Sequence, residues 1–145
     1  MEKAEIQALI REAFAAQKFA YVPYSHFHVG AALRGKNGQV FRGCNIENAS
    51  YTPTNCAERT ALFKAVSEGV REFDAIAIVG SKVGETNTLV TGPCGVCRQA
   101  LYEFGGPELT VIMARSEADY IVTTLGDLLP YGFGPTNLEI EPGAD

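Results

Sequence analysis

Two short segments of the sequence carry side chains that can bind a metal ion. Residues 54–59 read TNCAER and residues 92–98 read GPCGVCR, so three cysteines, Cys56, Cys94 and Cys97, come from two places in the chain. Three thiolates would leave the fourth position of a tetrahedral zinc ion open, which is typical of catalytic zinc. Zinc lowers the pKa of a water molecule bound at such a position. The pattern therefore favours a catalytic zinc site.

Glu58 is the candidate for moving protons at this site. It follows Cys56 by two residues, which is close enough to reach a water on the metal. A carboxylate there can take a proton from the water and return it to a leaving group. Both cysteine segments begin predicted helices, whose free N–H groups and positive dipole favour the thiolate form. If the two helix starts point to one place, the three thiolates converge beside Glu58.

A Cys-x-x-Cys motif alone also fits a redox protein or a structural zinc module. The redox interpretation leaves Cys56 and Glu58 without a role, and the chain lacks the tryptophan that usually precedes such a motif. A structural site would need a fourth ligand from Cys44, His26 or His28. A cysteine at a strand end is typically a small buried side chain, and we expect ordinary strand or loop positions for both histidines.

Length and charge limit the class of protein. With 145 residues the chain is long enough for one hydrophobic core, so we expect a single domain over residues 1–145. The net charge of −5 argues against a nucleic-acid partner, and no apolar run approaches the ~20 residues that span a bilayer. The first residues lack a secretory signal pattern. We expect a cytoplasmic protein with reduced cysteines and a small-molecule ligand, and no membrane partner.

The elements that must position these residues follow from periodicity and turn signals. Apolar residues at helical spacing predict a helix over about residues 2–18, and helix formers followed by Gly69 predict a second over 57–67. A third helix is expected over 94–104, closed by glycines, with a short helical turn at 127–130. We expect residues 136–145 to form a polar surface tail.

Five segments have strand patterns. Residues 29–33 and 39–42 flank an Asn-Gly pair and predict a hairpin, and the apolar run within 73–79 predicts a central strand covered on both faces. Residues 109–113 and 120–123 are too close for a parallel crossover, so they should pair antiparallel. The sheet should therefore be mixed, in an α/β fold. Phe63, Phe73 and Phe104 are expected in the core.

The cysteine segments resemble those of the small three-cysteine members of the cytidine deaminase family. Residues 56–58, CAE, and 93–97, PCGVC, agree with the zinc deaminase signature. The resemblance extends to residues 27–32, FHVGAA, to 43–50, GCNIENAS, and to 128–135, LLPYGFGP. It covers roughly residues 24–135 and implies a three-layer α/β/α domain with a sheet of about five strands.

The resemblance also implies roles for particular residues. Phe27 would stack on a pyrimidine ring, Asn45 and Glu47 would bind ribose hydroxyls, and a backbone group of Ala57 would contact the base. Phe133 would reach the pocket of a neighbouring subunit in a homotetramer. Three thiolates and a zinc ion sum to −1, and Arg59 would offset this charge by donating hydrogen bonds to ligand sulfurs. Arg98 also stands beside a ligand.

The function implied is zinc-dependent hydrolysis of cytidine and 2'-deoxycytidine to uridine and 2'-deoxyuridine with release of ammonia, in pyrimidine salvage. One zinc ion per chain is expected. A carboxylate at Glu47 would repel a phosphate, so free nucleosides should be preferred to nucleotides. A small deaminase of a cytosine-containing nucleoside antibiotic would share this site. A polynucleotide deaminase is disfavoured, because the acidic chain lacks basic stretches.

Overall fold

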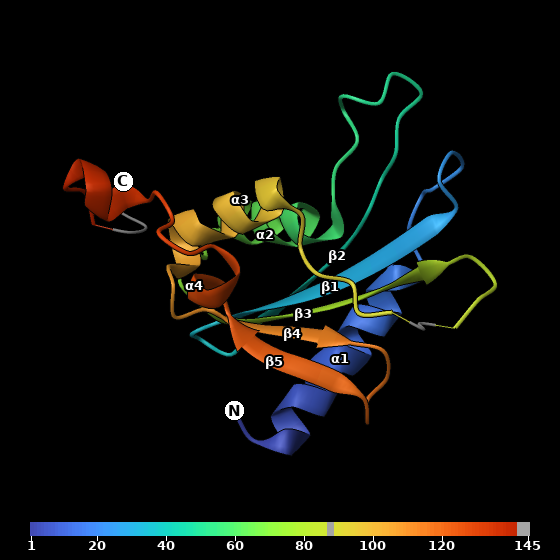
Figure 1. Ribbon diagram of the computed structural model, residues 1–145, viewed down its shortest axis with the longest axis horizontal. Coiled ribbons are helices and arrows are strands. Elements are labelled where there is room, and N and C mark those ends of the chain that lie inside the picture. Colours follow the sequence, from blue (N-terminus) through green and yellow to red (C-terminus); the bar gives the residue numbers. More distant parts are fainter. Residues whose placement is uncertain (87–88, 142–145) are drawn as a thin grey trace.

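A five-stranded sheet lies between two layers of helices in the computed structural model, which describes residues 1–86 and 89–141 (Figure 1). Helix α1 (Lys3–Gln17) covers one face of the sheet, and α2 (Ala57–Ser67) and α3 (Gly95–Gly105) lie side by side on the other. The expected three-layer α/β/α fold is confirmed. No helix in the described ranges is both long and apolar enough to cross a membrane.

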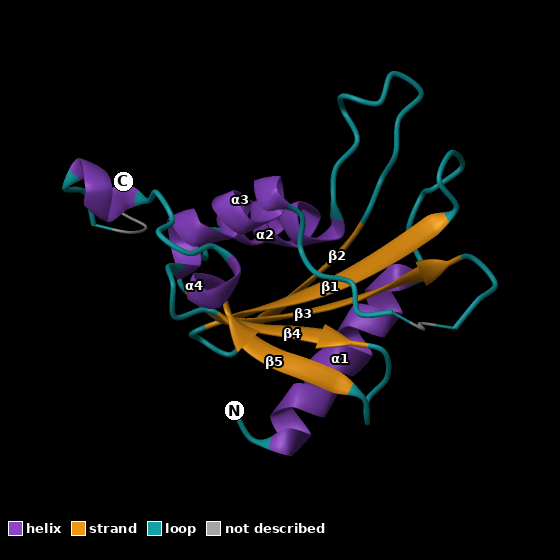
Figure 2. Cartoon of the chain, viewed as in Figure 1, coloured by secondary structure: helices purple, strands orange, loops and turns teal. Residues whose placement is uncertain are grey.

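The sheet is mixed, as the hairpin and loop lengths predicted (Figure 2). Its strands are β1 (Phe27–Gly35), β2 (Val40–Cys44), β3 (Phe73–Lys82), β4 (Thr110–Ala114) and β5 (Tyr120–Thr124). Their order across the sheet is β2-β1-β3-β4-β5. Only the β3–β4 pair is parallel among these neighbours, and the two sequence-adjacent pairs, β1–β2 and β4–β5, are antiparallel. In this order of five strands, β3 lies at the centre of the sheet.

The central position of β3 explains its nearly unbroken apolar sequence. Successive side chains of a strand point to opposite faces. Ile76 and Ile78 pack in the core beneath α2 and α3, whereas Ala77 and Val79 pack in the core beneath α1. All four are fully buried. The smaller residues face α1, so that helix can lie close to the sheet.

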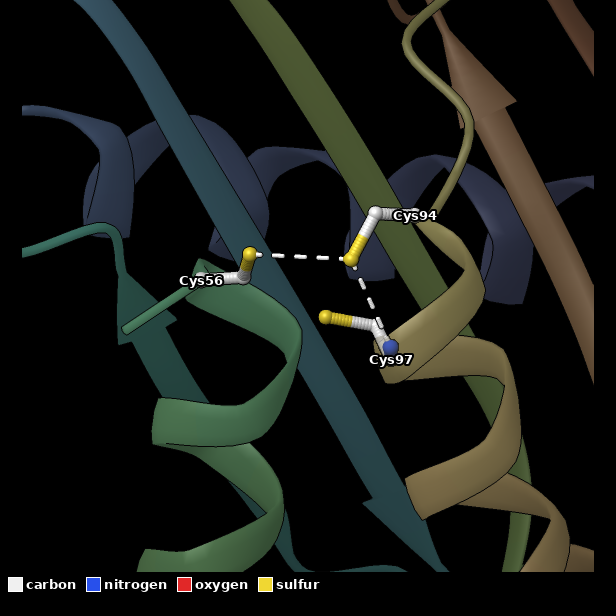
Figure 3. A group of neighbouring side chains, drawn as sticks. All are labelled: Cys56, Cys94 and Cys97. Atoms are coloured by element: carbon white, nitrogen blue, oxygen red, sulfur yellow. Dashed lines mark hydrogen bonds between the residues drawn. The ribbon is translucent and has the colours of Figure 1, made fainter. Parts of the chain in front are cut away.

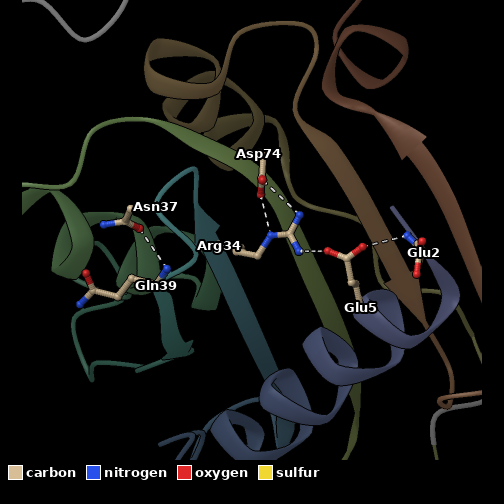
Figure 4. A network of polar contacts seen from close by, with 6 residues as sticks. All are labelled: Glu2, Glu5, Arg34, Asn37, Gln39 and Asp74. Atoms are coloured by element: carbon tan, nitrogen blue, oxygen red, sulfur yellow. Dashed lines mark hydrogen bonds and ion pairs between the residues drawn. The ribbon is translucent and has the colours of Figure 1, made fainter.

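A polar network ties the start of α1 to the sheet (Figure 4). Arg34 on β1 makes two hydrogen bonds to the carboxylate of Asp74 on β3, at 2.8 and 3.1 Å, and a third to Glu5 on α1 at 2.9 Å. A fork-to-carboxylate pair of this kind has a defined geometry. The network therefore holds the first turn of α1 in register with two strands.

Two local features differ from the sequence prediction. Phe63 is 50% exposed, because the buried stripe of α2 runs through Ala57, Ala61 and Ala65, away from position 63. β3 continues to Lys82, three residues beyond the predicted run. His26 lies in the loop just before β1 with a backbone φ of 56°, and a loop position is one of the two expected for it.

The end of the chain carries short helical turns. α4 (Leu125–Leu128) starts two residues before the predicted turn at 127–130, and a 3-10 helix, η1, covers Pro135–Leu138. Residues 136–141 of the predicted surface tail are exposed. Residues 142–145 of that tail lie outside the described residues.

Candidate metal centre and active site

Three thiols meet where α2 and α3 begin (Figure 3). Cys56 precedes the first residue of α2, Cys94 precedes α3, and Cys97 lies in the first turn of α3. Their sulfur atoms all lie within 4.8 Å of one another, and the Sγ atoms of Cys56 and Cys94 are 3.8 Å apart. Sulfurs around a tetrahedral zinc ion with ~2.3 Å bonds would be about 3.8 Å apart. The spacing and the donor type therefore fit zinc.

The start of each helix explains why the sulfurs point inward. Cys56 and Cys94 are helix N-caps with extended backbone, which turns their side chains across the first helical turn. The Sγ of Cys94 accepts a hydrogen bond from the backbone N–H of Cys97 at 3.5 Å. Cys97 lies three residues further on the same helix face and is buried. Thiolates at these positions gain from the positive ends of two helices.

Arg59 balances the negative charge of the sulfurs. Its Nη2 donates a hydrogen bond to the Sγ of Cys56 at 3.4 Å. The pKa of Cys56 is lowered to about 5 by hydrogen bonds from the Cys97 thiol and from Arg59, which outweigh burial. The pKa of Cys97 is raised, because its thiol donates to Cys56 and is buried. The pair thus holds one proton, which a bound cation would displace.

Glu58 is a buried carboxyl group at the start of α2. Only 4% of the residue is exposed. Burial raises its pKa to about 7, and the negative charge of Cys56 adds to this effect. A carboxyl group with a pKa near neutrality can both accept and donate a proton at working pH. Glu58 lies two residues after Cys56 at the start of α2, so the structure brings together three thiols that could hold a metal ion and a buried carboxyl group.

Two other residues near the motifs lie outside the sulfur cluster. Arg98 donates from Nε to the backbone oxygen of Pro93 and from Nη1 to that of Leu128, each at 2.7 Å. These bonds hold the loop before Cys94 in place, and among the hydrogen bonds of the described residues none joins Arg98 to a sulfur. Cys44 is not part of the cluster found among the described residues, and burial raises the pKa of its thiol.

Asn45 and Phe27 are joined at the start of β1. The side-chain amide of Asn45 donates to the backbone oxygen of Phe27 and accepts from the backbone N–H of Val29, both at 2.9 Å. The ring of Phe27 lies against Gly80 of β3, where an added Cβ would be 3.0 Å from Cε1 of that ring. The side chain of Thr91 also contacts Gly80, and its hydroxyl donates a hydrogen bond to the backbone oxygen of that glycine. These contacts place Phe27 beside the loop that leads to Cys94.

Glu47 lines a surface hollow of about 420 Å³ together with Tyr24, Ser25, Tyr51 and Thr54. Its carboxylate accepts backbone hydrogen bonds from Tyr24 at 3.0 Å and Ser25 at 3.1 Å, and a further one from the Ser25 hydroxyl. The Ser25 hydroxyl is the largest cause of a lowered pKa at Glu47. Glu47 is thus held as an anion with room to accept another hydroxyl group.

Several positioning contacts carry no signal in the sequence. Ser25 accepts a hydrogen bond from the N–H of Phe27 at 3.1 Å while it donates to Glu47, so it links two predicted binding residues. Gly43 lets the start of α2 approach β2, since an added Cβ would be 2.3 Å from the backbone oxygen of Ala57. Only the short spacing to a motif residue could have suggested Ser25 in advance.

Phe133 lies in the segment that follows α4. Its side chain is exposed, with 58% of the residue accessible. Its backbone oxygen accepts a hydrogen bond from Nε2 of Gln99 on α3 at 2.8 Å. Among the hydrogen bonds of the described residues, none joins Phe133 to the cysteine cluster. The structure therefore gathers the cysteines, Ala57, Glu58 and Arg59 at one place and leaves the ring of Phe133 facing outward.

Comparison with known proteins shows that this chain is similar to cytidine deaminases. The family model for the cytidine and deoxycytidylate deaminase zinc-binding region matches residues 3–113. The chain is 46% identical over 134 residues to a cytidine deaminase of Sporosarcina psychrophila, covering 92% of this chain and 95% of the relative. It is 52% identical over 127 residues to that of Halalkalibacterium halodurans, covering 88% and 92%.

A solved structure has the same architecture. The crystal structure of cytidine deaminase from Burkholderia pseudomallei superposes with a TM-score of 0.78 at 52% sequence identity. The match covers 87% of this chain and 97% of that chain. The family-model match over residues 3–113 contains both cysteine segments.

Proposed function

The chain belongs to the cytidine and deoxycytidylate deaminase family, and from this premise we propose that it hydrolyses cytidine and 2'-deoxycytidine to uridine and 2'-deoxyuridine with release of ammonia, in pyrimidine salvage. The single observation that carries the proposal is the meeting of three thiols beside a buried carboxyl group of raised pKa. Three sulfur ligands leave one position of a zinc ion for a water molecule. One zinc ion per chain is proposed.

Cys56, Cys94 and Cys97 would hold the zinc, which when bound activates water for attack on the pyrimidine ring. Arg59, already within hydrogen-bond distance of Cys56, would offset the charge of the three thiolates. A metal site with no net charge would polarise its bound water more strongly than a site with a net negative charge. This arrangement supports hydrolysis and leaves no role for a disulfide.

Glu58 would move the protons of the reaction. It takes a proton from the attacking water, delivers one to N3 of the ring, and later passes a second to the amino group that leaves C4. Its burial excludes competing water, and a pKa of about 7 lets it accept and donate with little cost. Because it would shuttle protons, Glu58 is proposed as an acid–base group and not as a metal ligand.

Substrate recognition is assigned to the start of β1 and the segment after β2. Phe27 would stack on the base, Asn45 and Glu47 would bind the ribose hydroxyls, and the backbone at Ala57 would contact the base. The side chain of Asn45 uses one N–H of its amide group on Phe27, so the second remains for a ligand. The hydrogen bonds on Glu47 hold it ionised, which favours sugar hydroxyls and opposes phosphate.

We further propose a homotetramer in which Phe133 of one copy completes the pocket of a neighbour. The support is the exposure of this ring on a segment whose backbone is bonded to α3. Sedimentation should then give a tetramer at micromolar concentration, and an active monomer there would contradict the proposal. Phe133→Ala should raise KM for cytidine more than it lowers the midpoint of thermal unfolding.

The activity can be tested by the loss of cytidine absorbance at a fixed enzyme concentration. The same preparation is assayed after removal of metal with a chelator, and again after one equivalent of zinc is returned. Turnover that disappears with the metal and returns with zinc is the expected result. Equal turnover with and without metal, or no turnover of cytidine and deoxycytidine by the zinc-loaded protein, would refute the proposed function.

A further inference from the structure

The segment 128–134, which begins at the last residue of α4 and carries Phe133, lies along one face of α3. Three residues of that face contact it: Arg98, Gln99 and Tyr102. Positions 98 and 102, and 99 and 102, are four and three residues apart, so the three side chains are neighbours on the helix surface. Because α3 also carries the metal thiols at its start, one helix touches both parts of the proposed site.

The contacts lie on both sides of Phe133. Before it, the Arg98 guanidinium holds the backbone oxygen of Leu128 at 2.7 Å. Immediately on either side, Gly132 and Gly134 lie against the Tyr102 ring so closely that an added Cβ would be 2.8 Å and 2.7 Å from ring carbons. Only glycine leaves room for this approach. The backbone at position 133 is therefore fixed by its two neighbours as well as by its own hydrogen bond.

The backbone of Phe133 is held by these contacts, but its ring is largely exposed to solvent. The residue is 58% exposed although Gly134, the next residue, is buried. Covering the apolar area of an exposed ring by another surface removes it from water, which is favourable. A fixed backbone also removes part of the ordering cost that a flexible loop would meet on binding. The arrangement presents the ring outward from a rigid support.

We propose that Gln99 is a positioning residue that aims Phe133 at the substrate pocket of a neighbouring copy; this rests on the function and assembly proposed above. Arg98 and Tyr102 fix the path of the segment, and Gln99 sets the orientation at position 133 through the backbone oxygen. In this arrangement α3 serves two sites, its own metal through Cys94 and Cys97 and the adjacent pocket through Gln99.

A double-mutant cycle between Gln99 and Phe133 tests this assignment on the zinc-loaded assembly. Gln99→Ala removes the hydrogen bond and should raise KM for cytidine about 2- to 10-fold, the range for loss of one hydrogen bond, with kcat and zinc content close to the parent. In the Phe133→Ala background the same substitution should have no further effect on KM. Non-additivity of this kind is expected when one residue acts only through the other.

Two further variants make the test specific. Gln99→Glu keeps the length of the side chain but removes its N–H donors, so it should match Gln99→Ala. Glu103→Ala makes a comparable truncation at an exposed position four residues along α3 and should leave KM unchanged. Sedimentation and thermal unfolding of each variant check that assembly and folding are retained.

The outcomes separate clearly. An equal rise of KM with and without the Phe133 ring would overturn the proposal, because Gln99 would then act by another route. Loss of zinc, a fall in kcat at constant KM, or dissociation of the Gln99 variants would also overturn it. If the parent itself does not deaminate cytidine, the proposed function fails instead, and that result is seen before any variant is made.

Discussion

Replacing Glu58 by glutamine isolates proton transfer from every other property of the site. Glutamine has the same length and a similar hydrogen-bonding shape, and it fits a position where only 4% of the residue is exposed. It cannot cycle a proton. The variant should fold, bind about one zinc ion and bind cytidine, while turnover falls by ~10² to 10⁴, the usual contribution of a positioned acid–base group.

The raised pKa of Glu58 gives a second, independent magnitude in protein stripped of metal. Its rise from 4.5 to about 7 is roughly 2.5 pH units, or about 3 kcal/mol at ~1.4 kcal/mol per unit. The folded protein keeps this proton at pH values where the unfolded chain has lost it. The stability contributed is therefore full below pH 4.5 and is lost as the pH rises through 7.

Glutamine has no such pH dependence. After both proteins are treated with a chelator, the free energy of unfolding of Glu58→Gln should therefore be about 3 kcal/mol higher than that of the parent at pH 8. Near pH 4.5, where the folded parent keeps Glu58 protonated, this difference should be absent. Urea unfolding at both pH values measures this difference, and the absorbance assay with zinc analysis measures turnover. Turnover near the parent rate would refute the proton-shuttle role. Loss of zinc would make Glu58 a ligand.

Four other substitutions have distinct expected results. Cys94→Ala should lose zinc and activity, whereas Cys44→Ser should keep both. X-ray absorption of the zinc-loaded parent should show three sulfurs and one light atom around the metal, and four sulfurs would contradict the open site. Glu47→Gln should weaken nucleoside binding and reduce the preference for cytidine over its monophosphate, a preference that the parent must show in competition assays. Gly43→Ala should cost ~1–3 kcal/mol in urea unfolding, because its Cβ would be 2.3 Å from the backbone oxygen of Ala57; unchanged stability would show that α2 can shift freely.

Local patterns predicted the elements well where the local signal and the tertiary environment agree. The bounds predicted for α2, residues 57–67, are those observed, because helix formers end at Gly69, which has a φ of 90°. The predicted end of β3 was wrong, because pairing between Lys82 and Phe27 extends the strand beyond the apolar run. That pairing joins positions far apart in the chain, and no local pattern reports it.

The candidate site divides in the same way. Residue type and spacing pick out the three cysteines and Glu58, because metal binding and proton transfer require those groups. Ser25 and Gln99 act through backbone atoms of other residues, so their types alone indicate nothing. Asn45 was expected to face a ribose, and its contacts with the backbone of β1 emerge only from the fold.

The direction of the strands explains why two helix starts meet. β1 is antiparallel to both β2 and β3, and β3 is parallel to β4, so β2, β3 and β4 all run the same way. α2 connects β2 to β3, and α3 connects β3 to β4. Both connections step across the sheet in the same direction. Because connections between parallel strands are almost always right-handed, the two helices must lie on the same face.

Each of these helices then starts at the edge of the sheet where the preceding strand ends, which is where ligands bind in open α/β sheets. Cys56 stands at one start, and Cys94 and Cys97 stand at the other. The insertion of β1 between β2 and β3 sets how far apart α2 and α3 lie, and the sulfur spacing depends on that distance. A change that displaced β1 would therefore separate Cys56 from the other two sulfurs without altering any ligand.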